Sequence, residues 1–156
     1  MKDSENILLQ NFDIAPFDAI QNEDYKPAIE AAIAQARQEI DLITNNPEPA
    51  TFENTIAALD YAGYQLDRVT SIFFNLNSAE TNDSRITTAQ EFSPLLSEFS
   101  NDITLNEALF KRVKNVYDSR ESLDLTREEE VLLDKRYKGF SRNGANLAED
   151  KKARLR

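Results

Sequence analysis

Residues 24–44, DYKPAIEAAIAQARQEIDLIT, decide the fold class of this chain. Apolar residues recur in this stretch every three or four positions, which is the spacing of one face of an α-helix. Pro27 falls in the expected first turn, where its missing N–H costs little, and Asn45-Asn46-Pro47 follows as a stop signal. The stretch therefore predicts a long amphipathic helix with this apolar stripe: Tyr25, Ile29, Ile33, Ala36, Ile40 and Ile43.

The same spacing predicts further helices downstream. One helix is expected over residues 52–77, with Thr51 as its N-cap. Gly63 interrupts its apolar seam, at a cost of about 1 kcal/mol relative to Ala, and we interpret it as a place where a neighbouring helix comes close. Another helix starts at Thr81-Asn82-Asp83 and contains Pro94, so we expect a kink near Phe92-Ser93 or two helices that meet there.

Two more helices complete the predicted set. One spans residues 106–120. Thr126 and Glu129 form a capping box that starts the other, and Asn143-Gly144 can supply the left-handed residue that closes it.

Residues 1–22 contain Pro16 without a helical period and predict an extended arm pinned by its aromatic residues. The fold class is all-α, with about five to six antiparallel helices in a bundle-like lobe after the arm.

Composition excludes several kinds of site. The chain has 156 residues and a net charge of −10, with no His and no Cys. It therefore lacks the ligands of the usual zinc sites, the Ser-His-Asp and Cys-His nucleophile systems, and disulfides. The acidic charge argues against nucleic-acid binding, and the short apolar runs argue against a membrane span. Without a signal-peptide pattern we expect a cytoplasmic protein, or a periplasmic one if a signal has been removed.

Paired carboxylates are the first candidates for acid–base chemistry, as Glu128-Glu129-Glu130 or as Asp60 with Asp67. We interpret the glutamates as a first helical turn that complements the helix dipole. The two aspartates fit the solvated edge of an apolar seam. A polar cluster lacks the central Gly and final Glu of a calcium loop and is interpreted as an interhelical loop: Asn75, Asn77, Glu80, Asn82 and Asp83.

Basic residues gather near residue 138 with aromatic residues between them. On a helix these aromatics face inward, so the cluster is interpreted as a basic face whose stems cover apolar surface. Its members are Lys135, Arg136, Lys138 and Arg142. Phe73 is assigned to the core, whereas Phe74 lies off the main seam. No catalytic or metal-binding residue is assigned, and no substrate-binding residue can be named.

Five segments, in this order and at this spacing, resemble the N-terminal region of a known enzyme family. They are NEDYKPAIEAAI (22–33), TFENTI (51–56), VTSIFFNLNSAETND (69–83), SNDITLNEALFKRV (100–113) and NGANLAEDKKARL (143–155). The family is that of thimet oligopeptidase and oligopeptidase A, zinc metallopeptidases, and the segments look most like its peptidyl-dipeptidase (Dcp-like) branch.

The resemblance implies an almost wholly helical enzyme with two lobes around a deep channel. Its catalytic part carries H-E-x-x-H and a further Glu as zinc ligands, and Dcp-like members release dipeptides from the C-terminus of short peptides. The N-terminal helices help to wall the channel. This chain has no His to match the motif, so the chain alone is not expected to bind catalytic zinc or to cleave peptides; zinc is implied only for the full-length protein.

The expected organisation is an arm (1–22), a helical N-terminal domain (23–147) and the start of a further helix (148–156) that is cut within the element. The expected partners are the missing catalytic part of the same polypeptide and short peptides, not nucleic acid or membrane. If the catalytic part docks on this domain, apolar side chains should be exposed where it docks. The candidates for such exposure, or for packing against the arm, are Phe12, Phe17, Ile72 and Phe74. The alternatives are a stand-alone acidic interaction module and an inactive paralogue that sequesters peptides.

Overall fold

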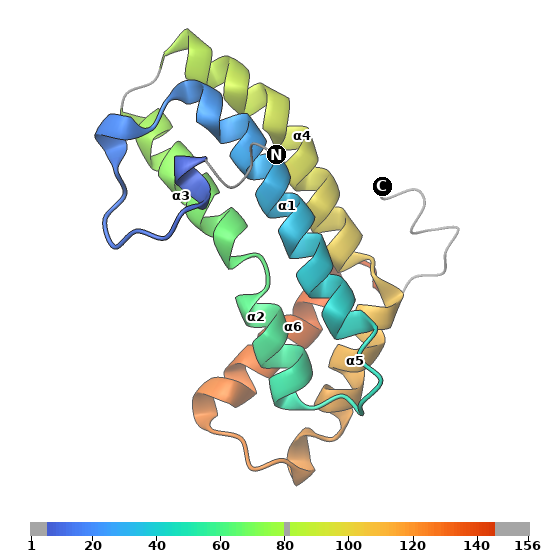
Figure 1. Ribbon diagram of the computed structural model, residues 1–156. Helices are drawn as coiled ribbons and strands as arrows, with labels where there is room; N and C mark the ends of the chain where they lie inside the picture. Colours follow the sequence, from blue (N-terminus) through green and yellow to red (C-terminus); the bar gives the residue numbers. More distant parts are fainter. Residues whose placement is uncertain (1–5, 80–81, 146–156) are drawn as a thin grey trace. The chain divides into compact units, whose positions relative to one another are not determined.

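The computed structural model describes residues 6–79 and 82–145 of the chain (Figure 1). These residues form helices and turns without a strand, which confirms the all-α prediction. The α-helices are α1 (Asn22–Thr44), α2 (Ala58–Tyr61), α3 (Tyr64–Ala79), α4 (Asp83–Thr104), α5 (Glu107–Asp118) and α6 (Arg127–Arg142). A π-helical segment, Phe52–Ala57, precedes α2, and single 3-10 turns lie at Ile7–Leu9, Phe17–Ala19 and Arg120–Ser122.

The described residues form two compact units. The first contains residues 6–38, 63–79 and 82–97, and the second contains residues 39–62 and 98–145. Helices α1 and α4 each begin in the first unit and end in the second. Within the described part of the chain, none of the helices combines the length and the apolar character that crossing a bilayer requires.

The first unit packs its core around the aromatic ring of Phe73. Tyr25 of α1 and Phe92 of α4 both meet this ring edge-on, with centroids 4.9 and 4.7 Å away. Ile29 and Val69 are fully buried in the same unit. The predicted apolar stripe of α1 is therefore confirmed, since each of its six residues is buried.

The N-terminal segment is held against α3 by one apolar residue and two polar side chains. Leu8 is fully buried in the turn Ile7–Leu9. Gln65 Nε2 donates to the Leu9 carbonyl at 2.9 Å, and Arg68 Nη2 donates to the Leu8 carbonyl at 3.0 Å. The segment was expected to be pinned by its aromatic residues. Phe12 does lie against Arg68 of α3, whereas Phe17 is 51% exposed and the fully buried anchor is Leu8.

The prediction of one helix over residues 52–77 is wrong. The backbone forms a π-helical segment and α2, breaks at Ala62-Gly63, and continues as α3. Ala62 is extended, and Gly63 has a φ of +81°, which an L-residue adopts only with strain. The apolar period continues through residue 63 because the residues on both sides of the break still need a buried face.

Pro94 does not divide its helix in two. Helix α4 runs unbroken from Asp83 to Thr104, so the alternative of two helices that meet near Phe92-Ser93 is wrong. Proline removes one backbone donor, but Phe92 and Phe99 are both buried. Packing of this apolar face outweighs the loss of one hydrogen bond.

The second unit packs α5 and α6 against each other and against the π-helical segment. Its core includes Ile56, Leu109, Val113 and Leu133, all almost fully buried. Two capping boxes fix where helices start: Thr51 with Asn54, and, as predicted, Thr126 with Glu129.

The end of α6 also follows the prediction. Gly144 has a φ of +94°, and the Ala145 N–H donates to the Phe140 carbonyl at 3.0 Å, which is the Schellman arrangement. Ala145 is buried in the same core as Phe140. The predicted further helix at 148–156 lies outside the described residues.

Candidate functional site

Helix α6 carries the basic cluster and begins after the Thr126 capping box. Leu133 and Phe140 are seven positions apart, so they lie on the same face of the helix, and both are buried in the core. Tyr137 stacks on Tyr117 with ring centroids 3.8 Å apart and an interplanar angle of 7°. The prediction that the aromatics between the basic residues face inward is confirmed.

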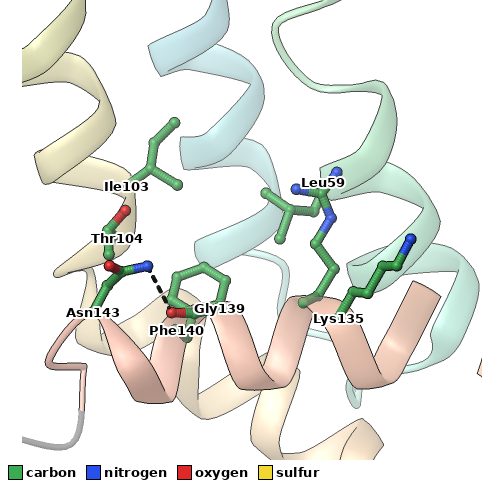
Figure 2. A pocket seen from close by; sticks show the side chains of 8 residues that line it. Leu59, Ile103, Thr104, Lys135, Gly139, Phe140 and Asn143 are labelled. Atoms are coloured by element: carbon green, nitrogen blue, oxygen red, sulfur yellow. Dashed lines mark hydrogen bonds between the residues drawn. The ribbon is translucent and has the colours of Figure 1, made fainter. Parts of the chain in front are cut away.

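A hollow of about 170 Å³ lies beside the basic face of α6. Figure 2 shows Ile103 and Thr104 on one side of it, Leu59 on the other, and Gly139 along α6. A Cβ atom on Gly139 would meet nothing within 4 Å, so the missing side chain keeps this wall open. The lining residues are Leu59, Ile103, Thr104, Lys135, Arg136, Gly139, Phe140 and Asn143.

The charges at this hollow are partly neutralised. Arg136 Nη2 donates to Asp60 Oδ1 at 2.5 Å, with both side chains between one third and one half exposed. Lys138 pairs with Asp134 one turn earlier on α6 at 2.7 Å. Two of the four basic residues of the cluster, Arg136 and Lys138, are therefore held in surface ion pairs, each worth about 0–1 kcal/mol.

The hollow was not predicted from the sequence. The available signal was Gly139 inside an otherwise regular helical pattern, three residues after Arg136 and four before Asn143. This spacing places the three residues on one helix face. Asn143 Nδ2 donates to the Gly139 carbonyl at 2.9 Å, which gives this carbonyl at the end of the face a hydrogen-bond donor (Figure 2).

The structure gives the carboxylate candidates structural roles. Glu129 accepts from the Thr126 N–H in the capping box, and Glu130 pairs with Arg127. Asp60 pairs with Arg136, and Asp67 is exposed in the first turn of α3.

The polar cluster at 75–83 is part of two helices and of the residues that link them. Asn82 Oδ1 accepts from the Arg85 N–H at the start of α4, and Asn75 Nδ2 donates to the Ser71 carbonyl. Glu80 lies outside the described residues. Among residues 6–79 and 82–145, no three Asp or Glu side chains come together as a group that could hold a metal ion. The described residues offer no such group and the sequence has no His or Cys, so we assign no zinc ligand among them.

The four apolar docking candidates behave differently from one another. Ile72 is buried, so the alternative of an exposed docking residue is wrong for it, whereas arm packing stays a prediction. Phe12 is half-buried beneath the Arg68 guanidinium, 4.7 Å from the ring centroid. Phe17 and Phe74 are 51% and 43% exposed.

Among residues 6–79 and 82–145, Tyr25 and Lys114 have pKa values shifted from their ordinary ones. Burial raises the pKa of Tyr25 above its ordinary value of 10.0, and the nearby Arg85 charge opposes this rise. A hydrogen bond to Asp118 raises the pKa of Lys114, which is on the surface. Neither group lines the hollow beside α6.

Comparison with curated proteins identifies the relatives of this chain. Dipeptidyl carboxypeptidase of Salmonella typhimurium is 44% identical over 140 residues, which cover 90% of this chain and 21% of the relative. Dipeptidyl carboxypeptidase of Escherichia coli is also 44% identical, over 144 residues and 21% of its length. Oligopeptidase A of Salmonella typhimurium is 28% identical over 149 residues and 22% of its length.

These matches confirm the resemblance to the dipeptidyl carboxypeptidase and oligopeptidase A family. No protein-family model matches the sequence. The chain spans about a fifth of the length of the curated relatives it matches. The relatives are peptidases by name, and what they share with this chain is one stretch of their sequence.

Proposed function

We propose that this chain is the N-terminal, non-catalytic helical domain of a Dcp-like zinc metallopeptidase that releases C-terminal dipeptides from short peptides. The observation that supports the proposal is the 44% identity, which covers nine-tenths of the chain but only 21% of the relative. The chain has no His, so the H-E-x-x-H motif has no counterpart in it. The zinc and the catalytic groups then belong to the remainder of the polypeptide.

The proposed role of the domain is to form one wall of the substrate channel. Such a wall acts by shape and charge, since it admits an extended peptide and excludes a folded protein. Residues 1–100 contain 17 acidic and 5 basic residues, a net charge of −12. This surface favours the approach of cationic peptides over anionic ones. The proposed compartment is the cytoplasm.

The proposal that this chain is non-catalytic is tested by comparing the purified chain with the complete polypeptide. Both are incubated with a short unblocked peptide, and dipeptide release is followed by mass spectrometry. The complete polypeptide should release dipeptides, and a chelator should stop it, whereas the 156-residue chain should release none. Chelator-sensitive release by the purified chain would contradict a non-catalytic role.

The wall itself is tested by hydrogen exchange on the complete polypeptide. A non-hydrolysable peptide is added, and amide exchange is mapped onto residues 6–145. Slower exchange at one or more helices of this chain would support a channel wall. Unchanged exchange throughout these residues, with protection confined to the remainder of a peptide-saturated enzyme, would exclude it.

A further inference from the structure

Two of the most exposed large apolar residues of the second unit belong to one hollow. Leu42 at the end of α1 is 75% exposed, and Tyr61 at the end of α2 is 76% exposed. They line an open hollow of about 390 Å³ whose walls are mainly apolar. Ile43, Ala58 and Ala62 complete its apolar surface. We call it the Leu42–Tyr61 hollow.

The polar edge of this hollow is fixed by Arg112 of α5. Its Nη1 donates to the Asn46 carbonyl at 2.9 Å, and its Nη2 donates to Asn54 Oδ1 at 3.1 Å. Asn54 Nδ2 in turn donates to the Pro49 carbonyl at 2.9 Å. Asn46 and Asn54 both line the hollow. Because these groups bond within the unit, the edge holds its shape, and most of the remaining surface is apolar.

The backbone beside the hollow is unusual. Asn54 belongs to the π-helical segment Phe52–Ala57, and Ala58 follows it directly. Such segments are rare and frequently mark functional sites. Here the segment is stabilised by the Thr51 capping box and by buried Phe52, Thr55 and Ile56. The hollow is therefore a preformed feature of the unit.

We infer that the Leu42–Tyr61 hollow is the surface on which the remainder of the same polypeptide docks. The inference rests on the proposed function. About four-fifths of the length of the curated relatives lies outside the matched stretch, so a large covalently linked partner is available. An exposed Leu and an exposed Tyr on one apolar hollow resemble the centre of an interface, with polar groups at the edge. The occupant that this surface fits is therefore an apolar segment of that remainder.

The absence of Cys from the chain allows a direct test. Leu42→Cys and Tyr61→Cys are made separately, in the 156-residue chain and in the complete polypeptide, and circular dichroism checks that each remains helical. Thiol labelling rates are then measured at each position from the modified peptides by mass spectrometry. We expect labelling at both positions to be at least tenfold slower in the complete polypeptide than in the chain.

Two comparison positions make the test specific to this surface. Ile14 is 82% exposed in the first unit, and Val131 is 37% exposed on α6. Ile14→Cys and Val131→Cys should label at similar rates in the two proteins. Equal rates at residues 42 and 61 in a complete, active polypeptide would overturn the inference, as would protection at residue 14 or 131 alone.

This result can be separated from a failure of the proposed function. If source cells contain the chain only at its own mass, the proposed function fails and there is no remainder to dock. If they contain a longer, active peptidase in which residues 42 and 61 label freely, the proposed function stands and the docking surface lies elsewhere.

Discussion

Gly63 has a φ of +81° at the break between α2 and α3. We expect Gly63→Ala to lower the free energy of unfolding by about 1–2 kcal/mol, because an L-residue is strained in the left-handed region. Crowding is not the cause, since a Cβ there would lie 3.8 Å from Ala36 Cβ, an ordinary contact. Helix α1 does come close at this position, as the sequence predicted, but the positive φ and not crowding requires glycine here.

Urea denaturation of Gly63→Ala and Gly63→Asn measures this effect. Asn visits the left-handed region more readily than Ala, so its loss should be the smaller one despite its larger side chain. The reverse order would show that space, and not backbone conformation, requires glycine at this position.

The raised pKa of Tyr25 lets us predict how the free energy of unfolding depends on pH under alkaline conditions. Because burial raises its pKa above 10.0, the folded state holds the phenolic proton more tightly than the unfolded chain does. The free energy of unfolding should therefore fall as the pH rises above about 10. Tyr25→Phe should make that fall shallower, which urea titrations between pH 8 and 11, at about room temperature, can measure.

At pH 7 the same substitution should have little effect. Tyr25 is then protonated in both states, and its buried hydroxyl has no hydrogen-bond partner among the described residues. Removal of such a group costs little. A large loss of stability at pH 7 would show that the hydroxyl makes a stabilising interaction. An unchanged alkaline slope would show that Tyr25 does not cause the fall.

Gly139 offers the opposite case to Gly63. It lies inside α6, and a Cβ there would meet open space. Gly139→Ala should raise the free energy of unfolding by about 0.5–1 kcal/mol through helix propensity. Thermal denaturation, with Lys138→Ala as a neighbouring exposed control, measures the gain. A loss of stability would mean that the backbone at 139 needs glycine.

The same two glycines show what the sequence alone could predict. Both interrupt a helical pattern, and nothing in the local sequence separates the one with a positive φ from the one in a regular helix. The difference depends on where the chain must turn, which is set by tertiary packing. Gly144 could be predicted because it follows Asn143 directly at the end of an apolar period.

At the scale of elements, Arg112 links α5 to the segment between α1 and the π-helical turn. Its guanidinium donates to the carbonyls of Asn46 and Glu48 and to the Asn54 side chain. Arg112→Met should lower the free energy of unfolding by about 2 kcal/mol, since hydrogen bonds to a charged group contribute about 1.5–3 kcal/mol.

Lys111→Met is the matched control for Arg112, because Lys111 is its exposed neighbour on α5. This control should change stability by less than about 0.5 kcal/mol. Equal effects of the two substitutions in urea denaturation would show that the three bonds of Arg112 do not hold the segment.

Helix ends that are marked by capping or breaking residues could be predicted from the sequence, whereas breaks inside a helical pattern could not. The Thr126 capping box and the stop at Asn45-Asn46-Pro47 depend on neighbouring residues, and both lie where expected. The π-helical segment and the continuation of α4 through Pro94 depend on which faces are buried. Local propensity therefore predicted the positions of the helices better than their continuity.

At the scale of the whole molecule, the candidate surfaces were the least predictable feature. The apolar candidates chosen from the sequence included buried Ile72, whereas Leu42 and Tyr61, which line an open hollow, were not chosen. Leu42 lies between Ile40 and Ile43 in the sequence but off their buried stripe. Exposure of this kind depends on the course of distant segments, such as the one that Arg112 holds.

The central claim is that this chain is one domain of a longer zinc peptidase. The most direct measurement is the mass of the native gene product, obtained by immunoblot of an extract of source cells with an antibody to this chain. The account predicts a band a little over four times the 17.8 kDa of the chain, because the 140 matched residues make up only 21% of the relative. A single band at 17.8 kDa would contradict the account and favour a stand-alone acidic helical module.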